Sequence, residues 1–576
     1  MRPVDPKRFQ AKWTPVRVKK TRQNKKVEPG SGSIRTDRAL RAAGDVRRVP
    51  AAPTVALIGF QSMGNLGLGY LAASLRQSGY DVRVLDIELP EAELVAAVRD
   101  AQPMLVGFSL IFQFYIRRYA SLMDALRREG IDAHFTMGGH YPTLSPHQTL
   151  AAAPELDSLV RYEGEVTLVE IVRALQSGSD WRKLDGVVWR QDGEIIVNPP
   201  RALIHDLDSL PYPERDFRPM RVLGRNIMPL LASRGCARTC SFCSIHTFYR
   251  SAPGKVVRIR KPIEVVREMR MLHDRDGVTV FLFQDDDFPL FGKKWRAWAG
   301  EFVDELHRAK LPGHVIWKIN CRADAVDAEL MARMRDAGLY LVYMGLESGT
   351  EEGLRTLHKE ISVEQNLAAV RLLKSLGIRF EFGFMLLDPS STFASVRANV
   401  GFLREIVGDG SASAQFCKML PYDGTPIKDG LEASGRLKGD VCTPDYDFLD
   451  PDLDRFYAAL AEIINVTGWI HGHEALTPQL NWAWTEAALI GRLYPALSDL
   501  AAYQAQLARI TADSNELLFS TVERVADVYQ HGSGQLPQPA LLRRRCEMTL
   551  DVLLEHRNAF MLRHQGLLLR ALEAAE

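Results

Sequence analysis

The chain has 576 residues, too many for one ordinary hydrophobic core, so two to four domains are expected. Its charged fraction of 25% and apolar fraction of 46% are typical of a globular protein. The sequence shows neither a secretory leader nor an apolar run of 18 residues, and its seven cysteines suit a reducing compartment. We therefore expect a cytoplasmic protein without a membrane partner.

Charge is unevenly distributed along the sequence. Residues 1–50 contain 15 Lys/Arg and 4 Asp/Glu, which leaves 57 against 67, a net charge of −10, for the remainder. This stretch lacks apolar periodicity and contains Pro, Gly and Ser, so it predicts a disordered basic arm. Such an arm can touch nucleic acid or an anionic surface, but it is more often simply solvated, and we do not expect a nucleic-acid partner.

Residues 51–195 alternate between buried strands and amphipathic helices. The wholly apolar run Thr54–Phe60 predicts a strand that is covered on both faces, and a helix over 70–78 follows it. This alternation predicts a doubly wound, Rossmann-like α/β domain. Further strands are expected at 82–86, 104–109 and 133–137, and further helices at 116–128 and 168–175.

A glycine turn follows the first of these strands. Gly67 and Gly69 stand in a G-x-G-x-x-A pattern, and Asp86 ends the second strand. This is a partial dinucleotide fingerprint, with glycines for a phosphate at a helix N-terminus and an acid for a ribose. On its own the motif is weak, so a nicotinamide-linked oxidoreductase is only a minor alternative.

The chain changes character after a proline-rich stretch. Five prolines between residues 196 and 225 predict an extended linker. Residues 226–430 then repeat a strand–helix unit six times, which favours a partial, open (β/α)6 barrel over a closed eight-fold one. The expected strands lie at 227–231, 278–283, 315–320, 341–346, 379–385 and 412–417.

Three cysteines follow the first barrel strand. Cys236, Cys240 and Cys243 have a C-x3-C-x2-C spacing, which chance would produce in roughly one such sequence in a thousand. Four-cysteine sites hold zinc or complete a cluster, whereas only three ligands are local here. We therefore predict a 4Fe–4S cluster with one iron open to a small molecule. A disulfide, a zinc site completed by a distant residue, and coincidence are the alternatives.

The cysteine loop, with Phe242 directly before its third cysteine, resembles that of the radical S-adenosylmethionine (SAM) superfamily. The resemblance covers about residues 50–430. It implies that the open iron chelates the amino and carboxylate groups of SAM, and that the reduced cluster cleaves SAM to methionine and a 5′-deoxyadenosyl radical. It also implies an electron donor of the flavodoxin or ferredoxin type.

Segments at other strand ends are similar to SAM-binding segments of that superfamily. They are FQDDDF (283–288) and GLESG (345–349), whereas PYDGT (421–425) resembles the segment that closes the barrel in that superfamily. Carboxylates suit the SAM ammonium group, and an arginine suits its carboxylate, although the arginine after the third strand would equally suit a salt bridge at the barrel rim. The resemblance implies SAM binding by Phe242, Asp285, Asp286, Arg322 and Glu347.

The domain at 51–195 resembles the cobalamin-binding domain that precedes many radical SAM cores. The similar pieces are LGLGYLAASLRQSGY, VGFS, GGHYPT and YEGE. The loop at 60–69 lacks the histidine of the D-x-H-x-x-G motif. Either cobalamin binds here without a histidine ligand from the protein, or the domain has lost cobalamin. The residues implied to bind cobalamin are Gly64, Asn65, Gly67, Ser109, Gly138, Gly139, Glu163 and Gly164.

Residues 431–576 predict a helical C-terminal domain that carries no catalytic motif. Helices are expected at about 451–466, 479–492, 495–512, 516–530 and 539–573. We expect this domain to cap the barrel and to set specificity, with Trp482 and Trp484 lining a substrate pocket or simply packing.

Together these features indicate a cobalamin-dependent radical SAM enzyme. It resembles the group that contains the anaerobic magnesium-protoporphyrin ester cyclase, hopanoid methylases and natural-product methylases. Methyl transfer to an unactivated carbon or phosphorus of a small-molecule substrate is the expected reaction. The alternatives are radical cyclisation or rearrangement without methyl transfer, and a non-catalytic iron–sulfur or nucleic-acid-binding protein.

Overall fold

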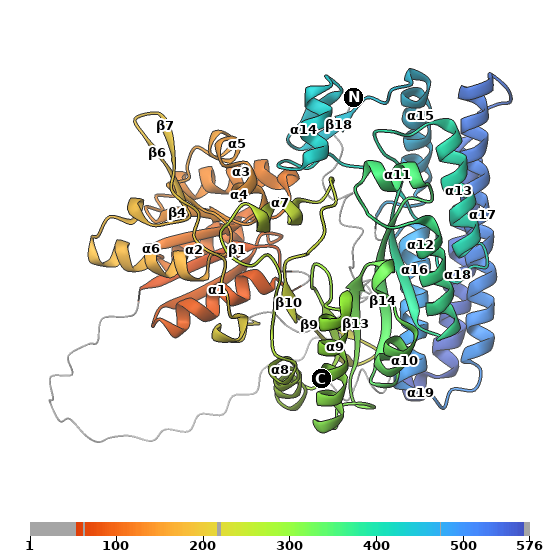
Figure 1. Cartoon of the computed structure of the whole chain (residues 1–576), viewed down its shortest axis with the longest axis horizontal. Coiled ribbons are helices and arrows are strands. Elements are labelled where there is room, and N and C mark those ends of the chain that lie inside the picture. Colours follow the sequence, from red (N-terminus) through yellow and green to blue (C-terminus); the bar gives the residue numbers. More distant parts are fainter. Residues whose placement is uncertain (1–52, 62–63, 216–219, 473, 569–576) are drawn as a thin grey trace, which may run out of the picture.

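The computed structural model describes residues 53–61, 64–215, 220–472 and 474–568. The predicted basic arm at 1–50 lies outside these residues. Figure 1 shows an N-terminal α/β unit, coloured red to yellow, beside a second α/β unit in green and teal, with long blue helices on the far side of the second unit. Among the described helices, none combines the length and apolarity needed to cross a membrane.

The N-terminal unit is built on a seven-stranded sheet with the order β2-β1-β3-β4-β5-β6-β7. Its first five strands are parallel, and β6 and β7 form an antiparallel hairpin that the sequence analysis missed. The order reverses between β1 and β3, which is where doubly wound sheets bind their ligands. The strands are β1 Thr54–Gly59, β2 Asp81–Asp86, β3 Leu105–Ser109, β4 His134–Gly138, β5 Ser158–Val160, β6 Val187–Gln191 and β7 Glu194–Val197.

Helices cover both faces of this sheet. Val55 and Leu57 of β1 pack under one pair of helices, whereas Ala56 and Ile58 of the same strand pack under the opposite group. This alternation explains why β1 reads as a wholly apolar run. The first face carries α1 (Leu66–Gln77) and α6 (Glu165–Ser177); the second carries α2 (Glu91–Ala101), α3 (Ile116–Arg128) and α5 (Pro146–Ala152).

The start of α1 differs from the expectation of residue 70. The Asn65 side chain accepts a hydrogen bond from Leu68 N at 3.0 Å and so begins the helix at Leu66. Gly69 is needed for close approach of another segment, because a Cβ there would overlap the Glu214 carbonyl oxygen. Its own carbonyl accepts a hydrogen bond from Glu214 N at 3.0 Å. Gly69 therefore joins the helix to the interdomain linker.

The second unit is an open, curled sheet with the order β16-β15-β14-β13-β12-β9-β8. Six strands are parallel, and β8 (Met220–Val222) is antiparallel to β9. The end of the expected linker at 196–225 is thus part of the barrel sheet. The parallel strands are β9 Arg225–Leu230, β12 Val278–Phe283, β13 Ile316–Cys321, β14 Leu339–Glu347, β15 Arg379–Leu387 and β16 Cys417–Lys418.

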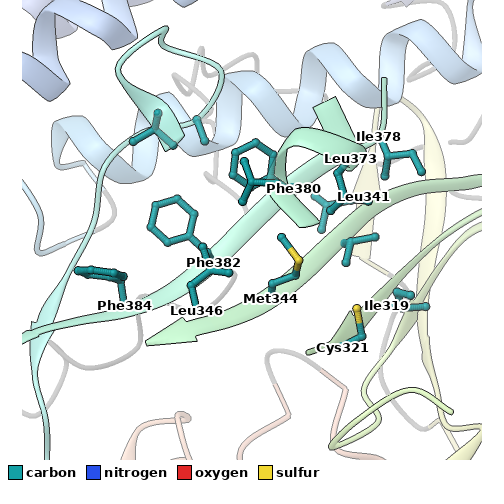
Figure 2. Packing of buried hydrophobic residues seen from close by; sticks show 14 of the residues in the cluster. Ile319, Cys321, Leu341, Met344, Leu346, Leu373, Ile378, Phe380, Phe382 and Phe384 are labelled. Carbon is teal, nitrogen blue, oxygen red and sulfur yellow. The ribbon is translucent and has the colours of Figure 1, made fainter. Parts of the chain in front are cut away.

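Alternating side chains divide the barrel strands into two faces. Figure 2 shows Phe380, Phe382 and Phe384 in a row along β15, beside Met344 and Leu346 of β14. All five are buried in one hydrophobic cluster. Helices α12 (Val363–Ser375) and α13 (Phe393–Val407) contact β15, and Leu373 and Val400 of these helices belong to the same cluster.

The C-terminal helices differ from the expectation at one point. The break expected at 512–516 is wrong, because α17 (Leu500–His531) is one continuous helix. Asn515, in the stretch where the break was expected, is buried and donates to Val407 O at 2.7 Å and Ala412 O at 2.9 Å. It also accepts from Ala414 N at 2.7 Å, which helps to limit the sixth strand to two residues. The other long helices are α15 Pro451–Thr467, α16 Leu476–Leu493 and α18 Pro539–Arg563.

A hairpin after the barrel contacts the N-terminal unit. It consists of β17 (Leu437–Asp440) and β18 (Thr443–Tyr446). The buried Gln113 side chain donates to Val441 O at 3.0 Å and accepts from Asp423 N at 2.8 Å. Arg117 pairs with Asp440 at 2.9 Å. The N-terminal unit is therefore held both by the linker and by this hairpin.

The observed architecture confirms the predicted fold class: a Rossmann-like domain, a partial (β/α)6 barrel and a helical C-terminus. The domain boundaries expected from the sequence stay predictions.

Candidate functional site

A cavity of about 570 Å³ lies at the C-terminal edge of the first sheet. The loops after β1, β3, β4 and β5 form one side of it. Residues that follow β9 and β12 of the barrel form another side, together with Tyr422 of the PYDGT loop. The barrel residues are Leu231, Ser233, Arg234, Gln284 and Asp286. One cavity is therefore shared by both α/β units.

All eight residues predicted to bind cobalamin line this cavity, although no bound ligand tests their role. Backbone geometry explains one of the glycines: Gly139 has φ +114°, and a Cβ there would overlap Leu110 O. Gly64 and Asn65 come from the β1–α1 connection, Gly67 lies in the first turn of α1, Ser109 ends β3, Gly138 and Gly139 lie at the end of β4, and Glu163 and Gly164 follow β5.

His140 also lines the cavity and was not among the predicted residues. Both ring nitrogens are buried and have no hydrogen-bond partner among the described residues. The ring packs on Phe248 with centroids 4.5 Å apart, and burial lowers the pKa of His140 to about 4. The imidazole is thus neutral at pH 7 and can offer a polar ligand group one donor and one acceptor. The GGHYPT motif contained this signal, but the sequence reasoning used only its glycines.

The three clustered cysteines lie on a loop between a short strand and a helix. The loop follows β10 (Ser233–Arg234), and Cys243 is the N-cap of α7 (Ser244–Arg250). Gly235 has φ +89° and passes so close to Val256 O that a Cβ would overlap it. All seven cysteines are free thiols in this structure.

The surroundings of the thiols test whether they fit a metal cluster. Burial raises the pKa of Cys236 to about 12 and that of Cys243 to about 11, so a metal must displace their protons on binding. Arg322 Nη1 lies 3.7 Å from Cys240 Sγ, which suits the sulfur-directed hydrogen bonding found around iron–sulfur clusters. In the described part of the chain, no three His, Cys, Asp or Glu side chains are gathered as ligands of a single metal ion. Thiolates of a cluster bind different irons and need not meet at one point. The cluster assignment of Cys236, Cys240 and Cys243 fits these surroundings and stays a prediction.

The three acids that follow β12 have different environments. Asp285 is buried, and its carboxylate accepts hydrogen bonds from Ser233 Oγ at 2.5 Å and from Ala232 N at 3.2 Å. Its carboxylate is therefore bound by the chain itself. Asp286 lines the cavity and accepts from Gly235 N at 3.0 Å. Burial raises the pKa of Asp285 to about 7, and desolvation raises that of Asp286, which is open to the cavity, to about 6.

Asp287 is the member of this triplet that the sequence analysis did not select. Its Oδ2 lies 3.9 Å from Cys236 Sγ, and its Oδ1 is buried without a partner among the described residues. Desolvation raises its pKa to about 6, against the opposing charge of Arg238 and Arg322. It therefore presents an unsatisfied acceptor beside the cysteine loop. Its identity as one of three adjacent acids gave no signal that would single it out.

Arg322 and Glu347 lie at neighbouring strand ends. Arg322 donates from Nε to Asp324 Oδ1 at 3.0 Å and from Nη2 to Lys359 O. Glu347 accepts from Lys359 Nζ at 3.0 Å. Its φ of +63° is strained for a non-glycine residue, and such strain is concentrated at functional sites. Lys359, which was not among the predicted residues, is buried in this network. Phe242, which was predicted to bind SAM, is partly buried and packs against the barrel core.

Comparison with known proteins agrees with this geometry. Residues 60–172 match the B12 binding domain family, and residues 230–401 match the radical SAM superfamily. The chain is 29% identical over 379 residues to "Uncharacterized methyltransferase PH0819" of Pyrococcus horikoshii. The aligned region covers 65% of this chain and 79% of that protein. It is 32% identical over 336 residues to "Anaerobic magnesium-protoporphyrin IX monomethyl ester cyclase" of Rubrivivax gelatinosus, covering 55% of this chain and 58% of that protein.

A solved structure supports the arrangement of the domains. The cobalamin-dependent S-adenosylmethionine radical enzyme OxsB, with aqua-cobalamin bound, superposes with a TM-score of 0.65 at 17% sequence identity. The superposition covers 91% of this chain and 84% of OxsB. At this identity the likeness shows a shared fold. The family matches and the shared cavity together show a chain that has a B12-binding domain followed by a radical SAM domain.

Proposed function

We propose that this protein is a cobalamin-dependent radical SAM methyltransferase that acts on an unactivated carbon or phosphorus of a small molecule. The observation that carries this proposal is the shared cavity. Its walls come from the B12-binding loops and from Arg234, which is two residues before Cys236. A corrinoid and a SAM-binding cluster at these positions would face the same space, which methyl transfer requires.

The cofactors and the protein have separate parts in this chemistry. When bound, the cluster supplies the electron that cleaves SAM, and the corrinoid supplies a transferable methyl group. Cys236, Cys240 and Cys243 would hold the cluster. Asp286 and Asp287 offer acceptors for the SAM ammonium group, because one lines the cavity and the other has a free buried oxygen.

The remaining SAM-site predictions divide into direct and supporting roles. The Asp285 carboxylate accepts hydrogen bonds from Ala232 and Ser233. We therefore assign Asp285 a supporting role, in which it positions the segment before the cysteine loop. Glu347, in its strained conformation beside Lys359, stays our candidate for the ribose or methionine part of SAM. Arg322 is held by Asp324 and contacts Cys240, so it would act beside the cluster.

Radical SAM proteins need a reductant. We propose a flavodoxin or ferredoxin type of donor and a cytoplasmic location, both carried over from the expectation for an iron–sulfur protein of a reducing compartment.

Anaerobic reconstitution tests the proposal. The protein is loaded with iron and sulfide, then incubated with SAM, a low-potential reductant and hydroxocobalamin. Mass analysis follows 5′-deoxyadenosine, S-adenosylhomocysteine and methylcobalamin. We expect all three products from the native chain and no 5′-deoxyadenosine from Cys240→Ala. Failure of the loaded native protein to bind corrinoid or to form S-adenosylhomocysteine would contradict methyl transfer.

Radical cyclisation is the second candidate, and the 32% identity to the Rubrivivax gelatinosus cyclase favours it. The same incubation separates the two. A cyclase would give 5′-deoxyadenosine without S-adenosylhomocysteine or methylcobalamin.

A further inference from the structure

The segment Arg161–Glu165, which follows β5 and is here called the clamp, contacts the chain on both sides of the cysteine loop. Four of its residues, Tyr162 to Glu165, also line the cavity. We propose that the clamp fixes the cysteine loop against the corrinoid cavity, so that binding of the corrinoid and binding of the cluster strengthen each other. This inference rests on the proposed function, because it requires that both cofactors bind.

On the N-terminal side of the loop, the clamp holds Arg234. Arg234 Nη1 donates to Glu163 Oε1 at 3.1 Å, and Nη2 donates to Glu165 Oε1 at 2.6 Å. The three side chains are 11%, 6% and 5% exposed, so the pairs are shielded from water and from salt. The guanidinium also lies over the Tyr70 ring at 4.6 Å. Because Arg234 is two residues before Cys236, these contacts set where the loop begins.

The second carboxylate oxygen of Glu163 also accepts hydrogen bonds from other residues of the chain. Its Oε2 accepts from Arg258 Nη1 at 2.7 Å and from Ile204 N at 2.7 Å. Arg258 lies on β11 (Arg258–Ile259), which pairs with the strand that carries Arg234. Glu163 was predicted to bind cobalamin, yet both of its oxygens are directed to protein donors. We therefore assign it a positioning role, exerted through Arg234.

On the C-terminal side of the loop, the clamp holds α7. Tyr162 donates from its hydroxyl to Ser251 O, the C-cap of α7, at 2.8 Å. Its ring packs on Phe248 of the same helix with centroids 5.6 Å apart. Since α7 begins directly after Cys243, this contact sets where the loop ends.

Tyr162 keeps an unfavourable backbone conformation while making these contacts. Its φ is +63°, in the left-handed region that L-residues disfavour, and its N donates to Thr143 Oγ1 at 2.9 Å. The conformation directs the ring to α7, while the next residue reaches Arg234. One strained segment thus reaches both ends of the loop, and a cluster that orders the loop also orders this wall of the cavity. Coupling between two binding sites is reciprocal, so a corrinoid that orders the wall favours the cluster equally.

The test compares corrinoid affinity with and without the cluster. Equilibrium dialysis measures the Kd of aquacobalamin for anaerobically loaded protein and for the same protein stripped of iron. We expect the native chain to bind aquacobalamin at least about 5-fold more tightly when the cluster is present. In Glu163→Gln and Tyr162→Phe the ratio of the two Kd values should fall close to one, while iron content and the cluster absorbance stay those of the native protein.

Two control variants remove the same chemical groups elsewhere. Glu486→Gln breaks a buried pair with Arg557 at 2.6 and 2.7 Å, and Tyr494→Phe removes a hydroxyl that donates to Leu223 O at 3.3 Å. Both should keep the native ratio. Equal Kd values for the loaded and stripped native chain, or clamp variants that keep the full ratio, would overturn the inference. A native chain that binds neither cofactor would instead overturn the proposed function. Tyr162→Phe loses a single hydroxyl, so it decides the matter if Glu163→Gln does not fold.

Discussion

Glu268 of α8 (Pro262–Asp276) offers a sharp test of how this fold joins the linker to the barrel. Its side chain is 0% exposed and accepts from Arg215 Nη2 at 2.7 Å and from Arg260 Nη1 at 2.6 Å. Replacing it by glutamine keeps the shape and removes the charge that both guanidinium groups share. These groups are only 3% and 4% exposed, so water cannot replace the lost partner.

The size of the effect follows from this burial. Breaking a buried ion pair by removing one partner costs about 3–5 kcal/mol. Asp208 lies 3.5 Å from Arg260 Nε and retains part of the compensation, and glutamine still accepts one hydrogen bond. We therefore expect Glu268→Gln to lower the free energy of unfolding by about 3 kcal/mol, the lower end of that range.

Urea unfolding, followed by far-ultraviolet circular dichroism, measures the change. The control is Glu405→Gln, which removes a carboxylate paired with Arg371 at 2.9 Å where both side chains are more than half exposed. That variant should lose less than about 1 kcal/mol. A loss below about 1 kcal/mol for Glu268→Gln as well would show that the Glu268 carboxylate does not stabilise Arg215 and Arg260 in the folded protein, and would refute the reasoning.

Three further outcomes are expected. Burial lowers the pKa of His134 to about 4, so between pH 6.5 and 4 the unfolded chain binds one more proton and the free energy of unfolding falls as the pH falls. His134→Asn should remove up to about 3 kcal/mol of that loss when the unfolding of both proteins is followed in parallel acid titrations. Gly69→Ala should destabilise the protein by about 1–3 kcal/mol because its Cβ would overlap Glu214 O, whereas Gly401→Ala, in open space on α13, should be neutral or stabilising in the same thermal scan. Cys240→Ala should lose most of the bound iron after reconstitution while Cys442→Ala keeps it; equal iron in both would exclude the C-x3-C-x2-C cluster.

Local patterns were enough to predict the main elements of the fold. The strand Val278–Phe283 and the helix Ile116–Arg128 have the predicted bounds, because apolar periodicity and flanking turns are encoded within a few residues. The cysteine spacing was informative for the same reason. The superfamily resemblance then supplied the cavity residues, whose motifs lie at the ends of predicted strands.

What could not be predicted depends on partners that are distant in sequence. Glu163 meets Arg234 and Arg258, which are 71 and 95 positions away, so nothing near the YEGE motif showed where its carboxylate points. Asn515 lies where a helix break was expected, and the partners that its side chain binds are more than 100 positions away in the sequence. Asp287 and Lys359 escaped selection because burial, not identity, makes them notable.

The attachment of the N-terminal unit at two separate places affects how a large ligand can be exchanged. Rotation about the linker would break both hydrogen bonds of the buried Gln113 side chain and the pair between Arg117 and Asp440. With these contacts kept, a corrinoid would have to enter without such a rotation, for example past the exposed side chains of Ile111 and Phe112 that line the cavity, or be enclosed while the chain folds. Enclosed in that way, it would dissociate slowly, and the amount retained in purified protein would reflect the vitamin supply during expression more than the affinity measured afterwards.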